Sequence, residues 1–107
     1  MKIVYHIGDT IGSETIVKKG ILIENTQPMA IENGEEKILL DEIKYVDFIK
    51  LTGGLGTMVK LVSGFDTIFL SVPRIFIDKG TGFAIINYFK TIKAGKLLRA
   101  EMDKQNS

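Results

Sequence analysis

Alternating apolar and polar residues recur through most of this 107-residue chain, and the pattern restricts it to a mainly β fold. The alternation runs through residues 2–7, 14–25, 29–40, 41–51 and 56–72. Successive side chains of a strand point to opposite faces, so each stretch predicts strands with one buried face. The short spacers between the stretches favour antiparallel hairpins.

Glycine and proline indicate where these strands turn or end. Asn33-Gly34 lies between two β-rich runs, and both residues tolerate the positive φ of a type I′ hairpin turn. Ser63-Gly64 predicts a second hairpin. Gly20, inside a β-rich run, predicts a bulge or bend. Pro73 cannot donate a ladder hydrogen bond and is expected at a strand end or edge.

The pattern changes near the C-terminus, where apolar residues recur at helical spacing from Thr81 onward: Ile85, Ile86, Tyr88, Phe89 and Ile92. We expect an amphipathic helix whose apolar face holds these residues and whose polar face holds Asn87, Lys90, Thr91 and Ala94. Asp78 or Thr81 could cap its start, and Gly95 could be the left-handed residue past its end. Residues 96–107 would then form a short helical segment or a frayed tail.

These elements predict one domain over residues 1–107. Its fold class is mainly β (α+β), with about seven antiparallel strands in two packed sheets or a small open barrel. One C-terminal amphipathic helix would close the barrel or cover one face.

Composition excludes several classes of function. Fourteen Lys and Arg against thirteen Asp and Glu give a formal charge of +1, which disfavours a nucleic-acid binder. The absence of cysteine excludes disulfides, thiolate metal sites and cysteine nucleophiles. The N-terminal residues lack the apolar core of a signal peptide, and we expect a cytoplasmic protein.

Two stretches resemble a pleckstrin-homology-like domain, close to the compact GRAM-like and bacterial versions. They are "ILLDEIKYVDFIK" and the hairpin "GTMVKLVSGFDTIFLSV", which is followed by "TGFAIINYFKTI"; with the element order, the match covers most of residues 21–92. The resemblance implies two nearly orthogonal sheets, a helix at one corner, and a binding or assembly module rather than an enzyme. The chain departs from the family because it has no tryptophan, and its only adjacent basic pair is Lys18-Lys19.

The stretch Gly53, Gly54, Leu55 and Gly56 raises the question of a phosphate-binding loop. A dinucleotide fingerprint needs a third glycine where Val59 stands, and it needs a helix where a strand is predicted. No Gly-Lys-Ser/Thr of a P-loop follows. We therefore predict a flexible hairpin loop, which could also contact a partner.

No catalytic group stands out. His6 is the single histidine, and a strand histidine satisfied by its surroundings is the simplest interpretation. The pairs Glu35-Glu36 and Asp41-Glu42 would be split between opposite faces of a strand, and the first is expected to be solvated. We predict no catalytic residue, no metal site and no cofactor.

Charge is unevenly distributed along the chain. Residues 22–47 hold seven acidic residues and two lysines, whereas residues 79–100 hold five basic residues and no acid. Cations near a helix C-terminus also complement the helix dipole, so the distribution alone does not define a site. The candidate residues for an anionic partner are Lys18, Lys19, Lys90, Lys93, Lys96 and Arg99.

Three functions remain open at this point. The preferred one is a non-enzymatic module that binds another protein or its own copies, since exposed strand edges and segregated charge favour association. The second is peripheral binding of anionic lipid headgroups through the basic residues. The third is a small-molecule carrier or an enzyme with a site between sheet and helix.

Overall fold

A computed structural model describes residues 1–12, 15–51, 56–74 and 86–107. These residues form seven strands and one helix: β1 (Lys2–Ile7), β2 (Lys18–Ile23), β3 (Ala30–Glu32), β4 (Lys37–Leu39), β5 (Ile43–Leu51), β6 (Gly56–Ser63), β7 (Asp66–Ser71) and α1 (Tyr88–Gln105). The strands make one antiparallel sheet in the order β4-β3-β2-β1-β7-β6-β5.

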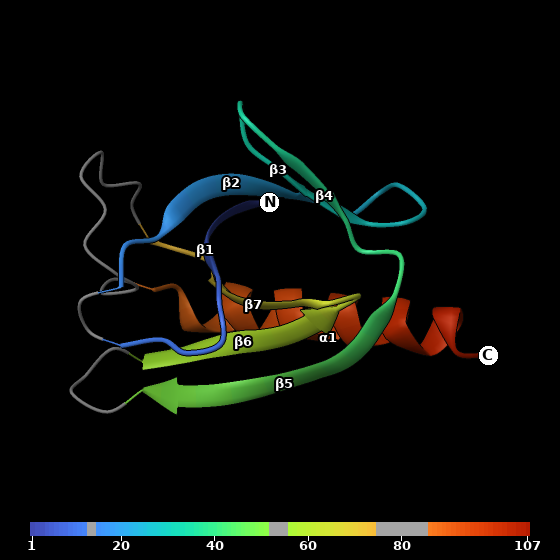
Figure 1. Cartoon of the computed structure of the whole chain (residues 1–107). Coiled ribbons are helices and arrows are strands. Elements are labelled where there is room, and N and C mark those ends of the chain that lie inside the picture. The colour runs from blue at the N-terminus through green and yellow to red at the C-terminus, as the bar shows by residue number, and fades with distance from the viewer. Residues whose placement is uncertain (13–14, 52–55, 75–85) are drawn as a thin grey trace.

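The sheet curls into an open half-barrel, and α1 packs against β5 and β6 (Figure 1). This confirms the predicted fold class in its open-barrel alternative, and it is consistent with a pleckstrin-homology-like topology. β1 lies in the middle of the sheet and connects its two halves, whereas β4 and β5 are the edges. Strands distant in sequence, β1 and β7, are therefore neighbours.

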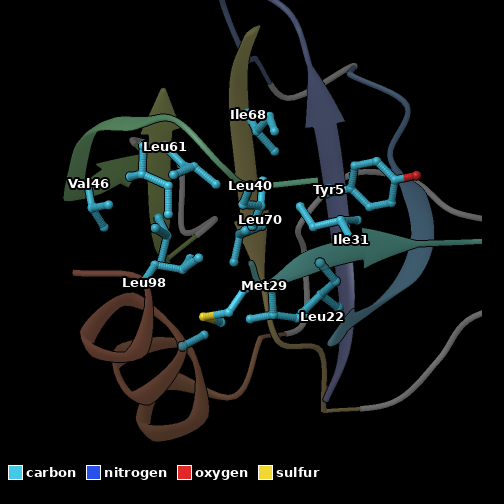
Figure 2. Packing of buried hydrophobic residues seen from close by; sticks show 14 of the residues in the cluster. Tyr5, Leu22, Met29, Ile31, Leu40, Val46, Leu61, Ile68, Leu70 and Leu98 are labelled. Carbon is cyan, nitrogen blue, oxygen red and sulfur yellow. The ribbon is translucent and has the colours of Figure 1, made fainter. Parts of the chain in front are cut away.

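Alternation along the strands builds the core on the concave side. Ile3 and Tyr5 of β1 are fully buried there, together with Leu22 of β2 and Leu70 of β7. Figure 2 shows Leu98 of α1 next to the strand residues of this cluster. Residues of the opposite parity form a smaller cluster on the convex side, made of Val4, Val17, Met58 and Phe69.

The helix is placed differently from the prediction. α1 begins at Tyr88, after Asn87 as N-cap, and continues through Gly95 to Gln105, so Gly95 does not end it. The expected tail from residue 96 is the second half of α1. Residues 75–85, with the suggested caps Asp78 and Thr81, lie outside the described residues.

The buried face of α1 was also predicted wrongly. Tyr88 and Phe89 are 52% and 82% exposed, whereas Thr91 and Ala94 are buried. The face that meets the sheet consists of Thr91, Ala94, Gly95, Leu98 and Glu101. Small residues on this face let the helix approach β5 so closely that a Cβ on Gly95 would overlap the ring of Phe48. The buried face of α1 is therefore the one that allows close approach to the sheet, and not the one that carries the aromatic residues.

The predicted hairpin at Asn33-Gly34 is confirmed, since β3 and β4 pair on either side of it, but its turn is not type I′. Gly34 lacks a positive φ; instead, Asn33 Oδ1 accepts hydrogen bonds from the backbone N–H of Glu35 and Glu36, at 2.8 and 2.9 Å. Gly20 makes no bulge, since β1 and β2 pair in continuous register there. A Cβ on Gly20 would lie 2.8 Å from Cε1 of Tyr5, so glycine makes room for that ring. The Ser63-Gly64 hairpin is confirmed, with Gly64 at φ 59°.

A polar cluster joins β1 and β2 to the turn between β3 and β4. Tyr5 Oη accepts a hydrogen bond from Asn33 Nδ2 at 2.8 Å and donates one to Glu36 Oε1 at 3.2 Å. Lys18 pairs with the same carboxylate at 3.1 Å, so Glu36 is not merely solvated, as had been expected. Burial, and then the charge of Glu36, raises the pKa of Tyr5 to about 12.

Gly95→Ala should destabilise the protein by about 1–3 kcal/mol, because the added methyl overpacks the contact with Phe48. On an exposed helix position the same change would stabilise by up to about 1 kcal/mol. Chemical denaturation measures the difference. In the Phe48→Leu background the loss should be smaller, and an unchanged or higher stability of Gly95→Ala alone would contradict the packing.

The stability difference between the wild type and Tyr5→Phe should become smaller as pH rises. The folded-state pKa lies above the unfolded value near 10, so the contribution of the Tyr5 hydroxyl is complete below pH 10 and is lost toward pH 12. Denaturation of both proteins across this range measures the difference. A difference that stays constant with pH would show that Tyr5 does not titrate in this way.

Candidate functional site

A groove with basic walls lies where four segments meet. Its volume is about 690 Å³. It is formed by the start of β1, the residue after β2, the chain that follows β7 and the first turns of α1. The lining residues are Met1, Lys2, Glu24, Val72, Pro73, Arg74, Lys90 and Lys93. We call this site the basic groove.

Pro73 explains why the sheet opens here. β1 and β7 pair in a register that joins Val4 to Ser71, which would place Pro73 opposite Lys2. Proline has no N–H to donate, so the ladder cannot continue in its regular form. The chain turns toward the helix instead, where Pro73 bridges to Ile86 and Asn87 N–H donates to the carbonyl of Val72 at 2.6 Å.

Thr91 fixes the wall between this segment and α1. Its hydroxyl accepts a hydrogen bond from Val72 N–H at 3.0 Å and donates one to the carbonyl of Asn87 at 2.7 Å. The side chain is fully buried. Asn87 also caps the helix, with Oδ1 accepting from Lys90 N–H at 3.1 Å. These bonds tie the start of α1, which carries Lys90 and Lys93, to the end of the segment that follows β7.

The electrostatics of the groove favour an anion. Lys2, Arg74, Lys90 and Lys93 face one acidic residue, Glu24, among the described lining residues, which gives a formal charge of +3 (four cations minus one carboxylate). Lys90 and Lys93 are exposed. Apolar atoms of Met1, Val72 and Pro73 lie beside these charges. The site can therefore hold a carboxylate or phosphate group that carries an apolar part.

The predicted basic residues do not form one site. Lys90 and Lys93 line the groove, while Lys96 is exposed on α1 and does not line it. Lys18 pairs with Glu36. Lys19 lies on β2 opposite Val4. Arg99 pairs with Asp47 at 3.0 Å and lies over the ring of Phe48.

Sequence reasoning missed Lys2 and Arg74. Lys2 opens the first strand, and Arg74 directly follows the proline that ends the last one. The signal that could have identified them is the pairing of β1 with β7, which brings the two ends of the strand region together. The spacing of Lys2 and Arg74 along the chain does not reveal this pairing.

The glycine stretch falls largely outside the described residues, since Gly53, Gly54 and Leu55 are not among them. Gly56 opens β6 opposite Leu51 with φ 80°, and β5 and β6 are antiparallel. The predicted reversal of the chain is therefore confirmed. A role of the loop in partner binding stays a prediction.

The edge of β5 is partly occupied by side chains. Gln105 Oε1 accepts from Ile43 N–H at 2.8 Å, and Arg99 Nε donates to the carbonyl of Val46 at 3.2 Å. The carboxylate of Asp47 accepts from Phe48 N–H at 2.8 Å. An incoming strand would have to displace these groups, so strand addition at β5 is disfavoured.

The acidic segment is partly neutralised within the chain. Four carboxylates of residues 22–47 have intrachain cation partners: Glu32 with Lys37, Glu36 with Lys18, Glu42 with Lys44 and Asp47 with Arg99. The charge difference between the acidic and basic segments of the sequence is therefore larger than the charge difference between the surfaces that they form.

Other chemistry is sparse in the described residues. They contain no group of three or more His, Cys, Asp or Glu side chains placed to hold a metal ion. His6 is half-buried and packs beside Gly8. In the part of the chain that the structure describes, no helix has the length and apolar character needed to cross a membrane.

No protein-family model matches the chain, and no curated protein or solved structure is significantly similar to it.

Thr91→Val should destabilise the protein by about 1–3 kcal/mol, because it leaves the buried Val72 N–H without its acceptor. Thr91→Ser keeps the hydroxyl and should lose less. Chemical denaturation measures the stability of both variants. Hydrogen exchange at the Val72 amide should accelerate in the valine variant alone. Equal stability of the valine variant and the wild type would show that this bond does not fix the wall.

Proposed function

We propose that this protein is a non-enzymatic binding module that holds an acidic segment of a protein partner in the basic groove. The observation that carries the proposal is the convergence of Lys2, Arg74, Lys90 and Lys93 on one concave site. Opposite charge in a partner would steer its approach and orient it there. The half-barrel with its C-terminal helix supports a pleckstrin-homology-like module, and the family resemblance implies binding rather than catalysis.

The shape of the groove favours a chain segment over a flat surface. An extended acidic peptide can enter a concave site and contact Pro73 as well as the cations. Glu24 in the lining repels any anion, and its carboxylate can accept peptide N–H groups, which a phosphate group lacks. The overall charge of +1 gives little support to nucleic acid as the partner.

An anionic membrane surface is the second candidate. Tyr88 and Phe89 are exposed beside Lys90, with their rings edge to face at 5.5 Å. Exposed aromatic rings next to lysines are typical of helices that bind at a membrane interface. This candidate uses the outer side of α1 more than the groove itself.

Lys90→Glu/Lys93→Glu should weaken binding of a fluorescent octaglutamate peptide by at least about ten-fold, since two attractive charges become repulsive. Fluorescence anisotropy at low salt measures the affinity. Lys96→Glu is the control on the same helix, because it reverses one lysine charge outside the groove, and it should bind within about two-fold of the wild type.

Equal binding by the double variant and the wild type would overturn the groove as the site, as would no binding by the wild type. Flotation with neutral and phosphatidylserine-containing vesicles tests the second candidate. Binding to acidic vesicles that Phe89→Ser abolishes, without binding of octaglutamate, would replace the protein partner by a membrane.

A further inference from the structure

Phe65 is the most exposed large apolar side chain among the described residues, with full exposure at the turn between β6 and β7. The turn itself requires only Gly64, whose φ is 59°. Its backbone is fixed, because Gly64 N–H donates to the carbonyl of Glu42 at 2.9 Å. A phenyl ring is thus presented to solvent on a rigid hairpin, which is the arrangement of an interface anchor.

The surroundings of Phe65 are predominantly acidic. Asp66 follows it, and Asp41 and Glu42 precede β5 beside the turn; all three are exposed. Lys44 is the nearby cation, with Nζ at 5.5 Å from the ring centre and 3.6 Å from the carboxylate of Glu42. These four residues have a formal charge of −2 (three carboxylates minus one lysine). We call Phe65 with these four residues the acidic tip.

The acidic tip complements the basic groove. The tip offers an apolar ring with acidic neighbours, and the groove offers apolar atoms of Met1 and Pro73 with basic neighbours. An aromatic ring also gains from cations placed over its face, and Arg74, Lys90 and Lys93 line the groove.

One molecule cannot make this contact with itself. Phe65 precedes β7 and Val72 follows it, so the tip and the groove lie at opposite ends of a six-residue strand. Such a strand spans about 20 Å. An acidic tip that enters the groove must therefore come from another molecule.

We propose that the acidic tip of one copy of this chain inserts into the basic groove of the next copy, head to tail. The inference rests on the proposed function, because it identifies the acidic segment that the groove holds as Phe65 and its neighbours. In a head-to-tail pair, one copy retains an unused groove and the other an unused tip, so association continues into rings or open chains. A contact of one hairpin tip is small, and it should be weak and sensitive to salt.

Sedimentation velocity at low salt tests the assembly. The wild type should shift from monomer to larger species between about 10 and about 500 µM, and should return to monomer at high salt. Phe65→Ser should remain monomeric, as should Lys90→Glu/Lys93→Glu. Ile16→Ser, which removes another exposed apolar side chain, and Lys96→Glu should assemble like the wild type.

Mixing the two monomeric variants gives the decisive result. Phe65→Ser retains a groove and the lysine variant retains a tip, so the mixture should form a heterodimer and nothing larger. Unfolding curves matched to the wild type establish that both variants are folded. No complex in the mixture, or assembly retained by Phe65→Ser, overturns the inference.

The result also separates this inference from the proposed function. A wild type that binds octaglutamate but stays monomeric at about 500 µM refutes self-assembly and leaves the groove as a site for another acidic partner. A wild type that does neither refutes both.

Discussion

The close approach of α1 to the sheet at Gly95 determines most of what is specific to this molecule. Because Gly95 has no side chain, the helix lies directly on the ring of Phe48 and beside Val59. At that separation, Glu101 reaches the N–H of Met29 and Gln105 reaches the carbonyl of Leu40. Toward its start, the same docking brings Thr91 to Val72 and so forms a wall of the groove.

The groove results from two local rules that act together. Proline ends the β1–β7 ladder, and the hydroxyl of Thr91 satisfies the N–H of Val72 once the strand has ended. Without the first, β7 would continue beside β1 and the gap would close. Without the second, a buried N–H group would lack an acceptor. An opening in a sheet is stable only where the backbone groups that it frees find other partners.

Local pattern predicts the strands well and the site poorly. The two-residue period and Ser63-Gly64 depend on neighbouring residues, so the sequence contains the information directly. Which face of α1 is buried depends on the space above Phe48, and the periodicity of the sequence does not contain that information. Periodicity therefore assigned Tyr88 and Phe89 to the buried face, although both are exposed. The groove joins Lys2, Arg74 and Lys93 from three distant segments, and only strand pairing places them together.

The same contacts limit how this fold can recognise another protein. Side chains of α1 occupy hydrogen-bonding groups on the β5 edge, and β4 at the other edge is only three residues long and begins with an exposed lysine. Both edges therefore offer little for strand addition. Recognition is left to side-chain surfaces, and the described residues present two of opposite charge at the two ends of β7. Because both strand edges offer little for pairing, the proposed contact between tip and groove would depend on charge and a single aromatic ring, without the risk of open-ended strand pairing.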